Sequence, residues 1–313
     1  MKKKIILRLS NEIGNQMFMY ASALSISKKM NRELLLDNET AFLLKKNISK
    51  YGLNNFKISS AVANDEDKFL GLSGYIKRKI FKKIDYFLKK KNFYIEEKDE
   101  YKKTKYNNNF DLINLADKTF FEGYFETEMY FTHYKEEILR EFDFKDFEKY
   151  KKNPFYLKVN QKNSISVCLR QNRFIEGNNT YNKKNVEKSI KFRDEQISYI
   201  NKSIFYIKKH ISNPIFYLWS NDLDNIDMNL FDTKLIKVFH NPNKIDDIDK
   251  RALDLFLISK CNHHITIPSS FNWWGAWLCQ KSDKIICRPD DNFFSDFFVN
   301  NKDFWPTKWI KIT

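Results

Sequence analysis

The strongest constraint on how this chain folds is the regular alternation of short apolar runs with helical patterns. Residues 5–9 form an apolar run, residues 16–30 carry apolar side chains at roughly helical spacing, and residues 34–37 form a second run. A strand, a helix and a strand in this order make a βαβ unit, whose strands are parallel. The chain is therefore predicted to open with a parallel sheet, with a tight loop at residues 10–14.

The same alternation begins again near residue 164. The pattern there predicts helices at 197–207, 253–259 and 273–279 between strands at 165–169, 215–219 and 264–267. A length of 313 residues also exceeds what a single core usually supports. We therefore expect an α/β protein with two domains, residues 1–155 and 156–313, with a linker at 150–161 and a cleft between them.

The composition favours a packed protein in a reducing compartment. Hydrophobic residues make up 42% of the chain against 7 Gly and 6 Pro, which argues against disorder. The cysteines show neither a CxxC pair nor a Cys/His spacing typical of zinc sites; they are Cys168, Cys261, Cys279 and Cys287. The opening apolar run is too short for a secretory signal, and no run approaches the ~20 residues of a membrane span. We expect a cytoplasmic protein.

The charge balance predicts an anionic partner without naming it. With 55 basic and 40 acidic residues the net charge is +15, which suits nucleic acid, an anionic membrane surface or a phosphorylated substrate, but also a merely solvated surface. Residues 75–88 concentrate this charge on an amphipathic helix, with Ile76, Ile80 and Ile84 on its apolar face. This helix is interpreted either as docked on its domain or as attached to an anionic membrane.

Three clusters of residues could carry chemistry, and the first is the glycine and two amides at Gly14, Asn15 and Gln16. They fall between a predicted strand and a predicted helix, where backbone N–H groups and the helix dipole attract an anion. An ordinary loop and helix cap would have the same composition.

The second cluster is the loop that starts with Arg170, directly after the predicted strand 165–169. A guanidinium at the carboxyl edge of a sheet can hold a diphosphate through two hydrogen bonds and stabilise it as it leaves. A plain ion pair with a neighbouring carboxylate is the alternative. Arg173 and Glu176 belong to the same loop.

The third cluster is the strand–loop–helix junction at Ser269 and Ser270. Their hydroxyl and N–H groups would cap the following helix and could hold phosphate oxygens. The alternative is that they are simple caps on a helix of core tryptophans. Asp254 lies on the preceding predicted helix, and a carboxylate can accept two hydrogen bonds from the edge of a guanine.

The sequence predicts neither a metal site nor a bound cofactor. The nearest Asp-X-Asp element, residues 222–224, is consistent with the start of a turn. No pair of histidines has the spacing of a zinc hydrolase, and His263 and His264 are expected to be structural. A metal-independent reaction is therefore predicted, in which arginine and backbone dipoles take the place of a cation.

Taken in order, these motifs resemble those of the family 11 glycosyltransferases, the α-1,2-fucosyltransferases. Residues 14–21, GNQMFMYA, resemble the family's G-N-Q-M-F-Q-Y-A, and residues 123–131, GYFETEMYF, are similar to G-Y-F-Q-S-E-x-Y-F. The segment from Asp254 to Trp277 resembles D-L-x-L-M-S-x-C-x-H-x-I-x-x-S-S-F-S-W-W-x-A-W. The similarity runs from the first strand nearly to the C-terminus.

This resemblance implies a GT-B-like fold of two Rossmann-type domains facing a central cleft, with residues 1–155 on the acceptor side and 156–313 binding a GDP-sugar. It implies inverting, metal-independent transfer of fucose from GDP-fucose to a hydroxyl, such as O2 of galactose, in a lipopolysaccharide or capsule. By matching positions, Arg170 would hold the β-phosphate, Asp254 the guanine, and Ser269 and Ser270 the phosphates. Asn15 and Gln16 would line the cleft.

One loop differs from the family pattern. The family's H-x-R-R-G-D corresponds to Cys168–Arg173 here, which keeps only the first arginine, Arg170. The donor is therefore GDP-fucose or a related GDP-sugar, and an inactive homologue that still binds GDP is a further reading. Glu176 is the nearest carboxylate for a general base, unless the leaving diphosphate takes the proton.

The predicted partners are thus a GDP-sugar, a glycan acceptor and, peripherally, the anionic inner membrane, with no nucleic acid. The rival from another class is a basic nucleic-acid-binding protein, suggested only by the charge and by aromatic residues interleaved with lysines.

Overall fold

The computed structural model describes residues 2–43, 50–96, 106–107, 114–176, 181–239, 249–290, 292–294 and 303–313. The chain forms two compact units. Unit 1 comprises Met1–Lys145 and Lys302–Pro306, and unit 2 comprises Asp146–Asn301 and Thr307–Thr313. The predicted α/β fold class is confirmed, because each unit contains a parallel sheet.

The first unit ends ahead of the predicted boundary at residue 155. The stretch expected as a linker contains parts of two helices, α4 (Phe147–Lys151) and α5 (Tyr156–Val159). Aromatic rings of Phe147, Tyr150 and Tyr156 pack against Phe256 of unit 2. These ring contacts hold the segment on the second unit, so it does not behave as a free connection.

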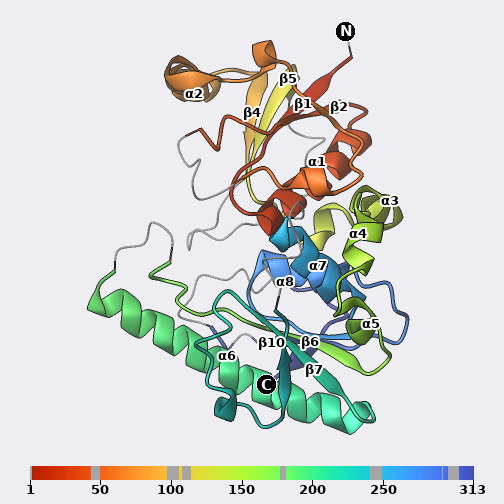
Figure 1. Ribbon diagram of the computed structural model, residues 1–313. Coiled ribbons are helices and arrows are strands. Elements are labelled where there is room, and N and C mark those ends of the chain that lie inside the picture. The colour runs from red at the N-terminus through yellow and green to blue at the C-terminus, as the bar shows by residue number, and fades with distance from the viewer. Residues whose placement is uncertain are drawn as a thin grey trace. The chain divides into compact units, whose positions relative to one another are not determined.

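Unit 1 is built on a five-stranded parallel sheet in the order β3-β2-β1-β5-β4 (Figure 1). Its strands are β1 (Lys4–Arg8), β2 (Glu33–Asp37), β3 (Ala61–Val62), β4 (Lys91–Ile95) and β5 (Leu115–Glu122). The helices of this unit are α1 (Ile13–Lys29), α2 (Gly71–Asp85) and α3 (Lys135–Glu141). The central strand β1 is apolar and fully buried at Ile5, Ile6 and Leu7, as expected of a strand covered on both faces.

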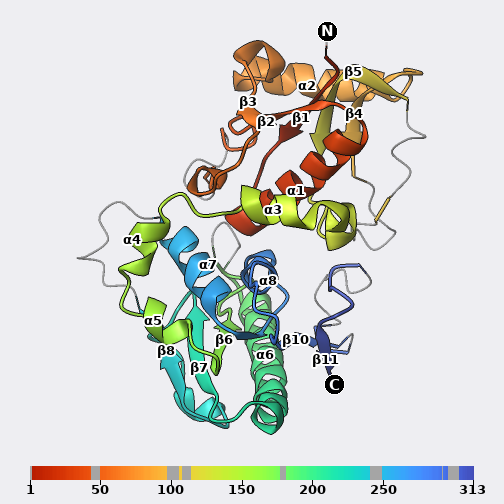
Figure 2. The same ribbon diagram turned by 90° about the vertical axis from the view of Figure 1, so that its right-hand side faces the viewer.

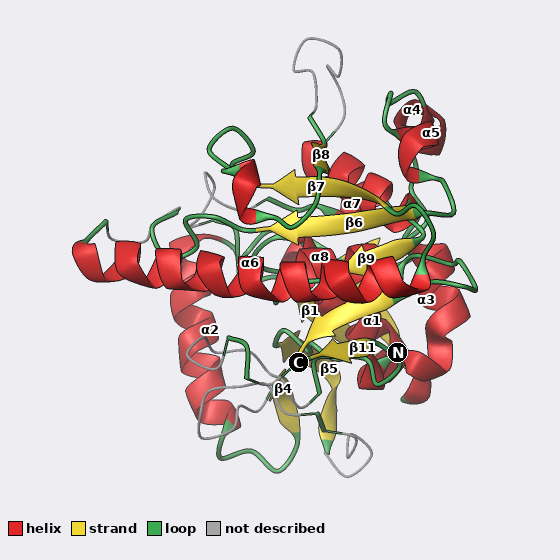
Figure 3. Ribbon diagram, turned by 90° about the horizontal axis from the view of Figure 1, so that it is seen from below, coloured by secondary structure: helices red, strands yellow, loops and turns green. Residues whose placement is uncertain are grey.

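Unit 2 contains a six-stranded parallel sheet in the order β11-β10-β9-β6-β7-β8. Its strands are β6 (Ser164–Leu169), β7 (Ile215–Ser220), β8 (Leu235–Lys237), β9 (His263–Ile265), β10 (Ile286–Pro289) and β11 (Ile310–Ile312). Its longer helices are α6 (Lys183–His210), α7 (Lys250–Lys260) and α8 (Ser270–Trp277). Figure 2 shows α7 beside α8, and Figure 3 shows α6 lying along β6.

The bounds of the predicted helices differ from those observed, most clearly in three of them. Helix α1 begins at Ile13, so Gly14 lies in its first turn and not in the predicted loop. It is buried at 14 of its 17 positions, which explains why its sequence shows little polar periodicity. Helix α6 begins at Lys183, well before the predicted residue 197. The sequence pattern did not indicate this start, because the first turns of the helix carry few apolar side chains. Helix α8 begins at Ser270 and ends at Trp277, earlier at both ends than predicted.

Helix α2 presents its apolar side chains to solvent. Its outer stripe, hereafter the α2 stripe, consists of Leu72, Ile76, Ile80 and Ile84, which are exposed by 73%, 56%, 50% and 50%. The helix is nevertheless docked on its unit, as one of the two interpretations expected. Arg78 and Lys82 both bind Glu122 at the end of β5, and the ring of Phe81 contacts that of Phe69. The docking therefore uses these residues and leaves the α2 stripe facing solvent. Among the described residues, no helix is long and apolar enough to span a membrane.

The predicted structural residues are buried as expected. All four cysteines are free and buried. His264 has no exposed surface, and its Nδ1 lies 2.8 Å from the Ser166 hydroxyl on the neighbouring strand β6. His263 is also buried and lies 3.0 Å from the carbonyl of Lys162. Burial lowers the pKa of His264 to about 3, so this ring is neutral.

Candidate active site

The order of the second sheet identifies where its ligand site should lie. The chain runs outward from β6 to β8 on one side and from β9 to β11 on the other, so β6 and β9 are neighbours from which the connections diverge. Ligands of such sheets bind beyond the carboxyl ends of the strands at this switch point. Arg170 follows β6 directly, and the segment leading to Ser269 follows β9. Two of the three predicted clusters thus meet at one edge.

The backbone of Arg170 is clamped by a buried glutamine from α6. Its N–H donates to Oε1 of Gln196 at 2.9 Å, and its carbonyl accepts from Nε2 of the same side chain at 2.9 Å. Gln196 has no exposed surface. The next residue is held in the same way. The N–H of Gln171 donates to Oδ1 of Asn221 at 2.8 Å, and Nδ2 of Asn221 donates to the carbonyl of Gln171 at 2.9 Å. The position of Arg170 is therefore fixed through its main chain, which leaves its guanidinium to act.

The guanidinium of Arg170 pairs with Glu176 in this structure. Its Nε donates to Oε1 of Glu176 at 2.8 Å and its Nη2 donates to the same oxygen. Arg173 approaches that oxygen to 3.7 Å. The loop folds back through Asn172, whose φ of 56° is left-handed and whose carbonyl accepts from the N–H groups of residues 175 and 176. The ion pair considered as an alternative exists, but it is only partly buried and can be exchanged for an anion.

The N-terminus of α8 supplies hydrogen-bond donors beside this loop's strand. Ser269 caps the helix in an extended conformation, with its side chain making no capping hydrogen bond, and Ser270 is the first helical residue. The first-turn N–H groups of a helix lack intrahelical partners and carry the positive end of the dipole. Buried Trp273 and Trp274 hold the helix in place. This terminus is suited to phosphate oxygens.

Asp254 on α7 lies close to the same edge. Burial chiefly raises the pKa of the Cys168 thiol, and the negative charge of Asp254 raises that pKa further, which requires the carboxylate to be near the end of β6. Helix α7 packs tightly on α8, because a Cβ at Gly275 would lie 2.4 Å from Cγ2 of Ile258. Asp254, Arg170, Ser269 and Ser270 are thus positioned by one packed set of elements in unit 2.

In unit 1 the two predicted amides have different environments. Gln16 has no exposed surface and donates to the carbonyls of Asn11 and Lys50 at 2.6 and 2.8 Å, while its Oε1 accepts from the N–H of Gly52 at 2.9 Å. These bonds tie two loops to α1 and give Gln16 a structural task. Asn15 is half-buried and donates to Glu126 at 2.8 Å. Contact of either residue with the donor stays a prediction.

Sequence reasoning missed the carboxylate that shapes the partner loop of Asn15. Both oxygens of buried Glu96 accept from the N–H of Phe125 at 2.9 Å, and one also accepts from Tyr124 at 2.7 Å. Gly123 is required beside it, because a Cβ there would lie 2.3 Å from Cβ of Glu96. The loop after β5 is thereby bent so that Glu126 reaches Asn15. Gly123 in the motif was the only sequence signal of this arrangement.

Within the described residues no cluster of three or more His, Cys, Asp or Glu side chains could hold a metal ion. Asp222 in the Asp-X-Asp element accepts hydrogen bonds from Asn225 at 2.9 and 3.1 Å, as in a turn.

The chain has clear relatives. The family model described as "Glycosyl transferase family 11" matches residues 1–313. An "Alpha-1,2-colitosyltransferase" of Escherichia coli is 26% identical over 98% of each chain. The "O-antigen biosynthesis glycosyltransferase WbnK" of the same species is 25% identical, over 97% of this chain and 99% of its own.

A solved structure shows the same fold. A mutant of Arabidopsis thaliana FUT1 in complex with GDP superposes with a TM-score of 0.53 at 12% identity, over 98% of this chain and 75% of that chain. Two parallel α/β units with this likeness define a GT-B-like fold. Within that class, the chain belongs to glycosyl transferase family 11.

The aromatic residues that suggested a nucleic-acid-binding protein have mixed environments. The rings of Phe69, Phe93 and Phe120 stack on one another, whereas Tyr86, Phe87 and Tyr181 are exposed. Membership of a glycosyltransferase family favours the enzyme over this rival.

Proposed function

We propose that the protein transfers a deoxy sugar, fucose or a close relative, from a GDP donor to a hydroxyl of a cell-surface glycan such as lipopolysaccharide or capsule. The observation that carries this proposal is the placement of Arg170 and the N-terminus of α8 at the switch point of the second sheet. Relatives named for colitosyl transfer and O-antigen biosynthesis support the substrate class. The proposed acceptor atom is a galactose hydroxyl such as O2.

In this proposal each residue has one task. The guanidinium of Arg170 binds the β-phosphate, the α8 terminus with Ser269 and Ser270 binds the remaining phosphate oxygens, and Asp254 accepts from the guanine edge. In this proposal unit 2 binds the donor, and unit 1, with Asn15, binds the acceptor.

The reaction follows from these contacts. The acceptor oxygen forms a bond to the anomeric carbon as the bond from that carbon to the β-phosphate oxygen breaks, which inverts the configuration. Negative charge develops on the leaving GDP, where Arg170 and the helix dipole stabilise it without a cation. The acceptor proton passes to Glu176 or to the departing phosphate. Because Glu176 pairs with Arg170 before the donor binds, a diphosphate that takes over Arg170 would also release the carboxylate.

Calorimetric binding of GDP, GMP and GDP-fucose tests the donor site. Metal-free wild type should bind GDP, and magnesium should not strengthen binding. Arg170→Ala should weaken it about 10-fold to 100-fold, the value of a charge-assisted contact. Arg193→Ala is the matched control, since Arg193 is 35% exposed against 36% for Arg170 and pairs with Asp194 within α6. If none of these guanine nucleotides bound, the proposed donor site would be refuted, and the chain would share only its fold with active relatives.

The sugar is tested separately from the nucleotide. A screen of GDP-linked sugars should give turnover with GDP-fucose or GDP-colitose. Turnover with another GDP-sugar only would overturn the deoxy-sugar assignment and preserve the site. GDP binding without turnover of any donor would identify an inactive homologue.

We also propose that the protein works in the cytoplasm at the anionic inner face of the membrane. The net charge of +15 and the exposed α2 stripe among lysines support this attachment. Flotation with anionic vesicles should carry the protein upward, and Ile76→Asp with Ile80→Asp should abolish it. Flotation that survives both substitutions would show that α2 is not the contact.

A further inference from the structure

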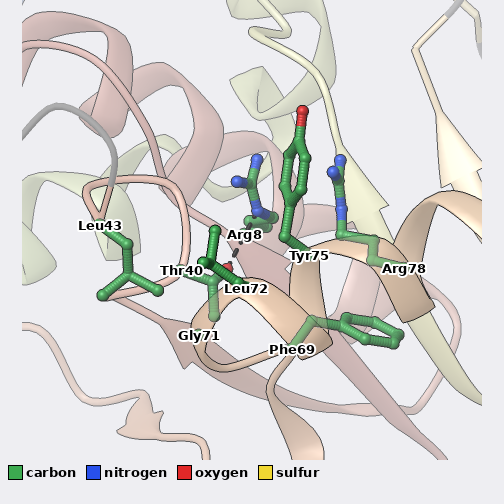
Figure 4. A pocket seen from close by; sticks show the side chains of 8 residues that line it. All are labelled: Arg8, Thr40, Leu43, Phe69, Gly71, Leu72, Tyr75 and Arg78. Carbon is green, nitrogen blue, oxygen red and sulfur yellow. Dashed lines mark hydrogen bonds between the residues drawn. The ribbon is translucent and has the colours of Figure 1, made fainter.

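Unit 1 contains a cavity of about 160 Å³ that the donor chemistry does not use (Figure 4). It lies at the carboxyl edge of the first sheet, where Arg8 ends β1 and Thr40 follows β2. Helix α2 closes one side with Leu72, Tyr75 and Arg78. Figure 4 shows Tyr75 between the two guanidinium groups, which point the same way.

Arg8 is unusually placed for an arginine. Its Nε donates to the Thr40 hydroxyl at 3.0 Å, and that threonine is itself anchored on Asp37, to which its N–H donates at 2.9 Å. The two terminal nitrogens of Arg8 make no hydrogen bond or ion pair with the described residues. Burial, and then the positive charge of Arg78, lower the pKa of Arg8. A guanidinium held in this way has unused donors directed at whatever occupies the cavity.

The second guanidinium is fixed and adds to the positive field. Arg78 donates from Nε to Glu122 at 2.6 Å and from Nη2 to its other oxygen, and Lys82 reaches the same carboxylate at 2.9 Å. Lys79 lies 4.5 Å from the centre of the Tyr75 ring. Hydrogen bonding and charge from Lys79, with smaller effects of the two arginines, lower the pKa of Tyr75. Arg78 and Lys82 thus share Glu122, and Lys79 lies beside Tyr75, while the carboxylates of Glu122 and Asp37 are the negative charges that act on Arg8. This excess of positive charge around the lining favours an anionic ligand.

The rest of the lining is apolar and continues onto the surface. Phe69 and Leu72 line the cavity, and Leu72 is also the first residue of the α2 stripe. Gly74 seats the helix here, since a Cβ at that position would lie 2.3 Å from the carbonyl carbon of Phe69. A charged recess that opens onto an exposed apolar stripe fits a molecule with an anionic head and an apolar tail.

We propose that this cavity binds the phosphate head of a lipid-linked glycan acceptor, with Arg8 as its principal ligand and the tail along the α2 stripe. This inference rests on the proposed function, because it names the class of acceptor that the transferase would use. Phosphate oxygens would complete the open donors of Arg8, and the tyrosine hydroxyl would donate to the same group. The same head chemistry occurs in bulk anionic phospholipid, so the test must separate the two sources.

Titration calorimetry with farnesyl diphosphate, inorganic diphosphate and farnesol provides that test. Farnesyl diphosphate should bind, and each of the other two probes should bind at least tenfold more weakly. Arg8→Gln should weaken farnesyl diphosphate at least tenfold. Lys77→Gln, which removes one exposed charge from the same helix outside the lining, should change it less than twofold. Unchanged melting temperatures would establish that both variants fold.

Three results would overturn the proposal. If Lys77→Gln weakened farnesyl diphosphate binding as much as Arg8→Gln, the binding would reflect general charge attraction. If Arg8→Gln bound farnesyl diphosphate as tightly as the wild type, Arg8 would not be a ligand in this cavity. Binding to phosphatidylglycerol vesicles that depends on Arg8, without binding of farnesyl diphosphate, would assign the cavity to bulk lipid. GDP affinity measured on the same samples separates this proposal from the donor function: wild type that binds farnesyl diphosphate but not GDP would refute the latter alone.

Discussion

The ion pair between Arg170 and Glu176 leads to a prediction with opposite effects on binding and on chemistry. In Glu176→Gln the carboxylate no longer competes with the donor diphosphate for Arg170. The two side chains are 36% and 27% exposed, so the pair contributes about 0.2–1 kcal/mol. Its loss should tighten GDP binding about 1.5-fold to 5-fold at low salt. Added salt should shrink this gain, since it screens the same charges.

The catalytic effect of Glu176→Gln should be far larger. If the carboxylate released by the donor takes the acceptor proton, its loss should lower kcat about 10²- to 10⁴-fold. Calorimetry of GDP and the rate of GDP release with saturating donor and acceptor measure the two effects. Glu187→Gln is the control, because Glu187 is 65% exposed and pairs with Lys183 in the first turns of α6.

Weaker GDP binding in Glu176→Gln would refute the competition and show that Glu176 orients Arg170 for the donor. An unchanged kcat with tighter GDP binding would assign the proton to the leaving phosphate.

Three further changes test the packing and the buried groups. Gln16→Ala should lower the free energy of unfolding by about 3 kcal/mol, because three backbone groups lose their partner, while GDP affinity stays within twofold; weaker GDP binding at full stability would place Gln16 at the donor. Gly275→Ala should cost about 1–3 kcal/mol in urea unfolding, and less when Ile258 is also Ala; additive costs would contradict the close approach. The pKa of His264 is about 3 in the folded chain, against an ordinary 6.5. Between these pH values only the unfolded chain binds the proton, so the free energy of unfolding should fall by about 1.4 kcal/mol per pH unit as the pH drops. His264→Gln should remove that one-proton dependence and the exposed His210→Gln should retain it; equal slopes in both would refute the assignment.

The edge of the second sheet that carries Arg170 and Ser269 could be predicted from sequence because it depends on local signals. An apolar run followed by Arg170, and another followed by Ser269, place both at carboxyl ends of parallel strands, and adjacent strands bring such ends together. The patterns could not show that Glu176 would pair with Arg170, since the loop geometry depends on Asn172 in a left-handed conformation.

Unit 1 was less predictable, because its interactions join residues distant in sequence. The spacing of Ile76, Ile80 and Ile84 correctly indicated an amphipathic helix, but the direction in which it faces is set by Glu122, more than thirty residues away. The strands β10 and β11 are short and lie at one side of the sheet, where the pattern gives little signal. Gln16 falls within a family motif, yet its partners are backbone groups of a later loop, to which no side-chain pattern points.

The amide clamp on Arg170 has a consequence for how this enzyme can diversify. The side chain of Gln196 forms hydrogen bonds with the N–H and carbonyl groups of Arg170 and with the carbonyl of Phe192. Mutations at positions 172–175 therefore leave this main-chain clamp on Arg170 in place. Under the proposed function, a lineage can replace the side chains at these positions while the main chain of Arg170 stays in place, and a library restricted to them is the natural starting point for changing which donor sugar is accepted.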